Sequence, residues 1–214
     1  MLNIKLLLPC FLLLTLISQA QDLYGEWRVL KSENSIGQQS SILKIESNNI
    51  HVYDFDRLLF EHDTHFLDAL TIQVGDTTLL EFEFIDGNRD FMKIKAVDGK
   101  PTDNLKYVRI LPTTGHENQL SNFKASTVAL KLKDNTLIFP LDKKLKSEDL
   151  LISYSAAITS DSVSIRKREN THFLKFYLKG KVTNIIPIRE INEKKLVLYG
   201  VPGHQGEVYL FIKT

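Results

Sequence analysis

Apolar and polar residues alternate with a period of two along many short stretches of this chain. In residues 78–85, three apolar side chains alternate with two glutamates, and residues 91–97 repeat the pattern with lysines at the polar positions. The Asp-Gly-Asn sequence at 86–88 separates the two stretches and is typical of a tight turn. Such alternation is the pattern of an antiparallel sheet with one face buried and the other in water. The sequence therefore predicts a β-hairpin here.

Similar stretches continue toward the C-terminus, with turn residues about every 8 to 12 positions, which is typical of an all-β protein. For two segments the sequence does not decide between helix and strand. Residues 56–70 place several apolar side chains near one face of a helix, and residues 147–149 could begin a short one. The other strands are predicted at residues 42–46, 50–53, 104–111, 128–132, 136–139, 151–156, 162–166, 172–178, 185–191, 196–199 and 208–212.

These strands fall into two groups of nearly equal length, separated by a Pro-Thr-Thr-Gly sequence and a polar stretch. We therefore predict one β unit over residues 21–112, a linker at 113–122 and a second β unit over 123–214. About eight strands in each group suit an antiparallel barrel, whose interior is either filled by side chains or holds one small ligand. The Thr-His-Phe-Leu sequence at 64–67 recurs at 171–174 and suggests internal repetition.

The first 20 residues have the composition of a secretion signal. Lys5 supplies a positive charge, residues 6–17 are almost wholly apolar, and Ser18-Gln19-Ala20 places small residues where a signal peptidase cleaves. The apolar run is shorter than the about 20 residues that span a bilayer, so we expect no transmembrane anchor. Cleavage near Ala20 would remove Cys10, the only cysteine, and leave a protein without disulfides. We expect a protein that is secreted, periplasmic or on the outer surface.

Charge and motifs argue against several functions. The chain has 27 basic and 26 acidic residues, a formal net charge of +1, so a nucleic-acid partner is not expected. No Gly-x-Ser-x-Gly sequence marks a nucleophile, and Glu81 and Glu83 have the spacing of solvated charges on a strand face. We therefore expect no catalytic residues, no bound metal and no cofactor.

The densest group of potential metal ligands lies in residues 54–65. His62 and His65 are three positions apart, which would put both imidazoles on one face of a helix. Glu61 or Asp63 could then add a carboxylate ligand to a zinc site. The spacing differs from the HExxH arrangement, and no third histidine is nearby in the sequence. A metal-assisted hydrolase is therefore a weaker hypothesis than a protein that binds a small ligand or a protein partner.

The segment Gly25-Glu26-Trp27 opens the first predicted strand and contains the only tryptophan. It resembles the Gly-x-Trp signature of lipocalins and lipocalin-like proteins. The resemblance implies an antiparallel β-barrel in which Trp27 fills the closed end and a basic residue near the end of the last strand packs across the indole. Arg109 would supply that cation if residues 22–111 form their own barrel, and Lys213 would supply it if the whole mature chain forms one fold.

The resemblance also implies the binding of a small apolar molecule among inward aromatic and aliphatic side chains, including Phe82, Phe84, Met92 and Tyr107. These four residues suit a filled core equally well. If the interior is filled, the alternative is a structural or protein-interaction module of the cell envelope, which holds a protein partner through exposed strand edges or loops.

Overall fold

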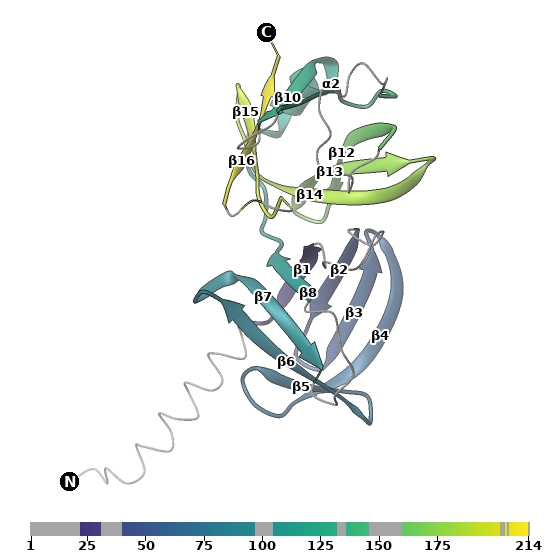
Figure 1. The fold of residues 1–214 in the computed structure, drawn as a ribbon, viewed down its shortest axis with the longest axis vertical. Coiled ribbons are helices and arrows are strands. Elements are labelled where there is room, and N and C mark those ends of the chain that lie inside the picture. Colours follow the sequence, from purple (N-terminus) through teal and green to yellow (C-terminus); the bar gives the residue numbers. More distant parts are fainter. Residues whose placement is uncertain are drawn as a thin grey trace, which may run out of the picture. The chain divides into compact units, whose positions relative to one another are not determined.

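The computed structural model describes residues 22–30, 40–96, 105–131, 136–145, 160–201, 204 and 206–213. The chain forms two compact units. The first contains the eight strands up to Arg109, and the second contains the elements from Ile110 onward. Both are built almost entirely from β-strands, as the alternating pattern predicts (Figure 1).

The first unit is a closed antiparallel barrel of eight strands. Each strand pairs with the next one in sequence, and the last strand pairs back with the first, so the ladder has no open end. The predicted all-β, antiparallel barrel is confirmed for this unit. Its strands are β1 (Gly25–Leu30), β2 (Ser41–Ile45), β3 (Asn49–Asp54), β4 (Arg57–Phe66), β5 (Thr71–Val74), β6 (Thr78–Ile85), β7 (Asn88–Ala96) and β8 (Leu105–Arg109).

The alternation of apolar residues decides which side chains face the barrel interior. In the predicted hairpin, Phe82 of β6 pairs with Ile94 of β7, and Phe84 pairs with Met92. Because residues two apart share a face, all of these side chains point inward. They belong to one apolar cluster, in which Phe84 is partly buried and whose other buried members are Leu23, Trp27, Leu43, Ile45, Ile50, Ile72 and Tyr107.

The open question over residues 56–70 is settled in favour of a strand, so the helical alternative is wrong. β4 pairs with β3 along most of its length. Val52 of β3 lies opposite Phe60, but the next residue, Tyr53, lies opposite Leu58, so Leu59 is the extra residue of a β-bulge. The bulge interrupts the two-residue period, which is why consecutive apolar residues here do not read as a strand.

The second unit is a curved sheet in the strand order β11-β10-β16-β15-β14-β13-β12, with β9 added in parallel to β14 (Figure 1). Its apolar face forms a second buried cluster, separate from that of the barrel. The elements are β9 (Thr114–Gly115), η1 (Glu117–Gln119), α2 (Leu120–Ala125), β10 (Thr127–Lys131), β11 (Thr136–Pro140), β12 (Ser162–Arg168), β13 (Thr171–Leu178), β14 (Lys181–Ile191), β15 (Lys195–Leu198) and β16 (Val208–Ile212).

Residues 113–122, predicted as a linker, hold β9, η1 and the start of α2 and belong to the second unit. Leu120 and Phe123 of α2 are buried in the core of that unit. The Thr-His-Phe-Leu sequences lie at the end of β4 and at the start of β13. The expected secretion signal at 1–20, the possible helix at 147–149 and the predicted strand at 151–156 lie outside the described residues. In the described part of the chain, no helix is both long and apolar enough to cross a membrane.

Candidate binding sites

Trp27 and Arg109 pack against each other where the first and last strands of the barrel meet. The register of β1 and β8 places these two residues directly opposite each other. The indole is fully buried, and its N–H donates a hydrogen bond of 2.9 Å to the carbonyl of Leu23. The guanidinium carbon of Arg109 lies 4.3 Å from the centre of the ring, within the range of a cation–π interaction.

The guanidinium of Arg109 is held by the backbone that leads into β1. Its Nη1 donates to the carbonyl of Tyr24 at 3.0 Å, and its Nη2 donates to the carbonyl of Asp22. Burial lowers the pKa of Arg109, and the carboxylates of Asp90 and Asp22 act against that shift, so the group stays charged near neutral pH. Gly25 has a φ of +126°, a conformation that favours glycine, and lies beside this guanidinium.

The four residues predicted to touch a ligand all lie in the barrel interior. Phe84, Met92 and Tyr107 follow one another across β6, β7 and β8 in the strand register. Phe82 and Met92 are buried within the apolar cluster, whereas Phe84 is half-buried, and its ring centre lies 6.4 Å from that of Trp27. These side chains therefore form one continuous apolar stretch of the interior that extends to Trp27.

Two residues carry a hydroxyl group into this apolar interior, and that of Thr64 lacks a hydrogen-bond partner among the described residues. Thr64 is 1 % exposed, and its position opposite Val74 places its side chain on the inner face. Tyr107 is 8 % exposed, and burial raises the pKa of its hydroxyl to about 12. Sequence reasoning did not identify Thr64. Thr64 lies two residues before Phe66, and residues two apart on a strand share a face, so the sequence could have placed it inside the barrel.

Further along the strands from Trp27 and Arg109, the interior remains apolar, but some of its side chains are only partly buried. Leu80 lies four residues before Phe84 on β6, and Leu105 lies four residues before Arg109 on β8. At about 3.3 Å per residue, each is displaced by roughly 13 Å along its strand. Both side chains are partly buried against the core cluster.

The histidines singled out as metal ligands do not meet. Both His62 and His65 are exposed on β4, and residues three apart on a strand point to opposite faces. The expectation of a shared face depended on a helix, and it is wrong. Among the described residues, no three His, Cys, Asp or Glu side chains gather in a way that could hold a metal ion.

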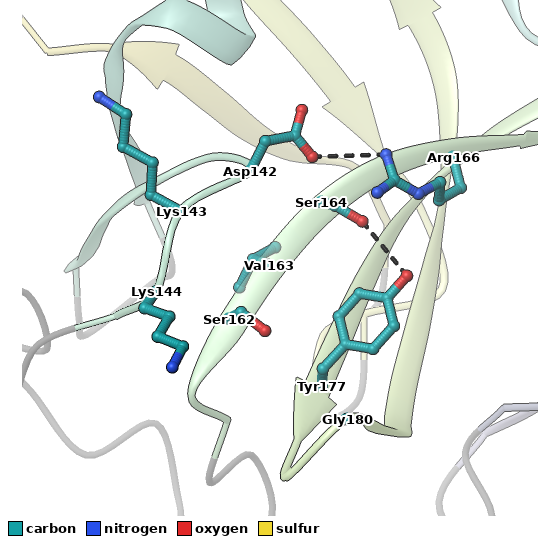
Figure 2. Close-up of a pocket in the computed structure, with 9 residues that line it drawn as sticks. All are labelled: Asp142, Lys143, Lys144, Ser162, Val163, Ser164, Arg166, Tyr177 and Gly180. Atoms are coloured by element: carbon teal, nitrogen blue, oxygen red, sulfur yellow. Dashed lines mark hydrogen bonds and ion pairs between the residues drawn. The ribbon is translucent and has the colours of Figure 1, made fainter.

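The second unit has a hollow of about 480 Å³ beside β12, which sequence reasoning did not identify (Figure 2). Two polar contacts lie within it. Nη1 of Arg166 is 3.5 Å from Oδ1 of Asp142, and the hydroxyl of Ser164 donates to that of Tyr177 at 3.3 Å. The lining residues are Asp142, Lys143, Lys144, Ser162, Val163, Ser164, Arg166, Tyr177 and Gly180.

The elements that form this hollow come from distant parts of the sequence. Ser162, Ser164 and Arg166 lie on one face of β12, whereas Asp142 and the two lysines precede β12 by about 20 residues, and Tyr177 lies on β13. The Ser-x-Ser-x-Arg alternation was the only local signal, and an ordinary solvated strand face has the same appearance.

Comparison with known proteins found no family model and no curated protein that matches this chain. Any family relationship therefore has to be argued from the barrel and its own residues.

Proposed function

We propose that the N-terminal barrel is a lipocalin-like, non-enzymatic binding unit of an exported protein and that its ligand is a small, mainly apolar molecule. One observation carries the proposal. The strand order of the barrel closes on itself and Trp27 and Arg109 fill one end, while the apolar lining continues to partly exposed side chains such as Leu80. Barrels of eight strands that hold one small ligand have this architecture.

The lipocalin-like character draws support from the agreement between sequence and geometry. Gly25-x-Trp27 resembles the family signature at the sequence level, and the barrel brings Arg109 of the last strand over the indole. Of the two cations considered for this role, Arg109 occupies it, and Lys213 follows β16 in the second unit. Export outside the cytoplasm remains part of the proposal because of the signal-like composition of residues 1–20.

The ligand we propose has a polar end. A buried hydroxyl without a partner costs about 1–3 kcal/mol, and a ligand hydroxyl or carbonyl that pairs with it would offset that cost. Thr64 offers such a hydroxyl within otherwise apolar surroundings, and Tyr107 adds a second hydroxyl in the same interior. A fatty alcohol or fatty acid suits this lining better than a plain hydrocarbon of the same length.

The test uses the fluorescent probe 1-N-phenylnaphthylamine and two variants at adjacent positions of β6. Leu80→Trp enlarges an inward side chain, whereas Glu81→Trp adds the same indole on the outer face, where Glu81 is exposed. We expect saturable fluorescence enhancement for the wild type and for E81W, and its loss for L80W. Circular dichroism checks that both variants are folded. Absence of binding to the wild type, or equal loss in both variants, would reject an interior site.

A second candidate function, a protein-interaction module, is favoured by a specific observation on β4. Leu58, Leu59 and Phe60 are 46 %, 37 % and 59 % exposed, although they are large and apolar. β4 pairs with β5 only through its last three residues, so the first part of the strand has β3 as its one paired neighbour. An extended segment of an envelope protein could add to this edge as a further strand.

A photo-crosslinking amino acid placed at position 60 in the natural host tests this second role. We expect one discrete crosslinked product from position 60 and none from position 81, which is exposed on the outer face of β6. Leu58→Asp should abolish that product. Equal crosslinking at both positions would indicate chance contact and reject the edge as a docking site.

A further inference from the structure

The hollow of the second unit lies on the side of β12 that faces away from the core. Val163 and Ile165 are buried in the apolar cluster, so Ser162, Ser164 and Arg166, which alternate with them, point to the other face.

The segment from Asp142 to Leu145 runs along the edge of β12 and forms one wall of the hollow. The N–H of Asp142 donates to the carbonyl of Val163 at 2.8 Å, and that of Leu145 donates to the carbonyl of Asp161 at 2.6 Å. Between them, Lys144 forms a bridge with Ser162. These backbone bonds fix where Asp142 and the two lysines stand relative to β12.

Positive charge predominates around this hollow. Lys143, Lys144 and Arg166 line it, against one carboxylate, that of Asp142. That carboxylate is 3.5 Å from Arg166, which is long for a charge-assisted hydrogen bond. Neither lysine forms an ion pair with any residue in the described part of the chain. The ammonium group of Lys175 adds a further cation, 5.8 Å from the centre of the Tyr177 ring.

The lining also has more hydrogen-bond donors than acceptors. A guanidinium has five N–H groups, and the hydrogen bonds of Arg166 to Ile165 and Asp142 both use Nη1. Its Nε and Nη2 therefore remain as donors. The hydroxyl of Tyr177 accepts from Ser164, which leaves the phenolic hydrogen free to donate (Figure 2). Such a lining is suited to a ligand that is negatively charged and accepts hydrogen bonds.

We propose that this hollow binds a small molecule that carries an oxyanion, with Arg166 and Lys144 as the charged anchors and Tyr177 as a neutral donor. Phosphate, sulfate and carboxylate share the required chemistry. A volume of about 480 Å³ accommodates such a group together with a small organic body. The nearly neutral chain argues for a small ligand over a polyanion. The site lies in the second unit and does not depend on binding by the barrel.

The experiment is a titration of the full mature protein with inorganic phosphate, followed by two-dimensional NMR of the backbone amides. Sulfate and acetate are titrated in parallel, and sodium chloride at the same ionic strength is the reference. We expect saturable shifts centred on Ser162, Ser164, Arg166 and Tyr177 with at least one of the three oxyanions. Shifts that chloride reproduces, or that lie elsewhere, would overturn the proposal.

Three variants and one control assign the contacts. We expect Arg166→Gln and Lys144→Gln each to weaken oxyanion binding about tenfold, and Tyr177→Phe about threefold, because charge-assisted hydrogen bonds are stronger than neutral ones. Lys213→Gln removes the same charge from an exposed position after β16 and should leave binding unchanged. Binding that is unaffected in R166Q and K144Q, or weakened equally in K213Q, would overturn the site.

Glycerol 3-phosphate and vesicles containing phosphatidic acid then separate a free ligand from a lipid headgroup. If R166Q binds either of them more weakly than the wild type does, the proposal is supported and the source of the anion is identified. If R166Q binds both as well as the wild type does, the proposal is contradicted.

Discussion

At the scale of single residues, the contact between Trp27 and Arg109 joins the first and last strands of the barrel. The guanidinium packs over the indole and also donates to backbone carbonyls that precede β1. Only 17 % of the Arg109 side chain is exposed, so water screens these interactions less than it screens a surface ion pair. The contact therefore adds to the hydrogen bonds of the β1–β8 ladder.

Replacing Arg109 by methionine keeps an unbranched side chain over the indole but removes the cation and its donors. We expect the free energy of unfolding to fall by about 2 kcal/mol, the sum of a cation–π contact and of backbone hydrogen bonds. Arg109→Lys, which retains the charge without the planar fork, should lose about half as much. Urea unfolding followed by Trp27 fluorescence measures both. If R109M were as stable as the wild type, the contact would contribute nothing to stability.

Tyr107 predicts a pH dependence of stability. The pKa of its hydroxyl is about 12 in the folded protein, because burial disfavours the phenolate, against 10.0 for an ordinary tyrosine. Between these values the unfolded chain releases a proton that the folded barrel keeps, so stability is full below pH 10 and falls as the pH rises toward 12. The slope attributable to this residue is about 1.4 kcal/mol per pH unit.

Urea unfolding at pH 9, 10 and 11, with Trp27 fluorescence as the probe, compares the wild type with Tyr107→Phe. We expect the variant to lose less stability over this interval, since it lacks the titrating hydroxyl. Parallel slopes for the two proteins would show that the hydroxyl titrates with its ordinary pKa.

At the scale of elements, the two-residue strand β9 depends on the absence of a side chain at Gly115. A Cβ there would lie 2.0 Å from the carbonyl oxygen of Ile191, and the residue has a φ of +99°. β9 lies in parallel register with β14 at this point, so a methyl group would force the two strands apart.

We expect Gly115→Ala to destabilise the second unit by more than about 2 kcal/mol, because a backbone clash adds to the strain of a positive φ. Gly206→Ala is the matched control. It has a φ of +106° with nothing within 4 Å of the added Cβ, so only about 1 kcal/mol of strain is expected. Urea unfolding by far-ultraviolet circular dichroism measures the difference. Equal losses in the two variants would show that β9 can move away without cost.

How far the elements could be predicted depended on whether one face of each was buried. The hairpin of β6 and β7 was predictable because charged residues occupy most of the outer positions around its centre and apolar residues the inner ones. β4 was not, since its first seven residues are exposed on both faces and a bulge at Leu59 shifts the period. In α2, only Leu120 and Phe123 are buried, and two apolar residues in a polar stretch do not distinguish a short helix from a linker.

The candidate sites also differed in how far the sequence could predict them. The resemblance to lipocalins suggested a basic residue over Trp27 and left Arg109 and Lys213 as alternatives, and the pairing of β1 with β8 decides for Arg109. The hollow of the second unit could not be predicted, since Asp142 lies beside Arg166 only because residues 142–145 form backbone hydrogen bonds with β12. Pairings of distant segments are a property of the tertiary fold that local alternation does not encode.

At the scale of the whole molecule, the two units share a pattern of connection. In each unit, the first strand of the main antiparallel path pairs with the strand that follows it and also with the last strand. In the first unit β1 pairs with β2 and β8, and in the second unit β10 pairs with β11 and β16. The Thr-His-Phe-Leu sequences lie at the end of β4 and at the start of β13, and each of these strands is the fourth of its path in chain order. This correspondence agrees with the suggestion of an internal repeat.

Each unit has its own apolar cluster, which predicts that each unfolds as a separate cooperative body. Trp27 is the only tryptophan, so its fluorescence reports on the barrel, whereas far-ultraviolet circular dichroism reports on both units. In Gly115→Ala, we expect the circular dichroism profile to gain an earlier phase in urea while the midpoint of the fluorescence transition stays where it is in the wild type. In R109M, the midpoint of the fluorescence transition should move to lower urea, whereas the unfolding phase of the second unit in circular dichroism should stay where it is in the wild type. A common shift of both signals in either variant would mean that the two units unfold together, and the stability of the barrel would then depend on residues outside its own core.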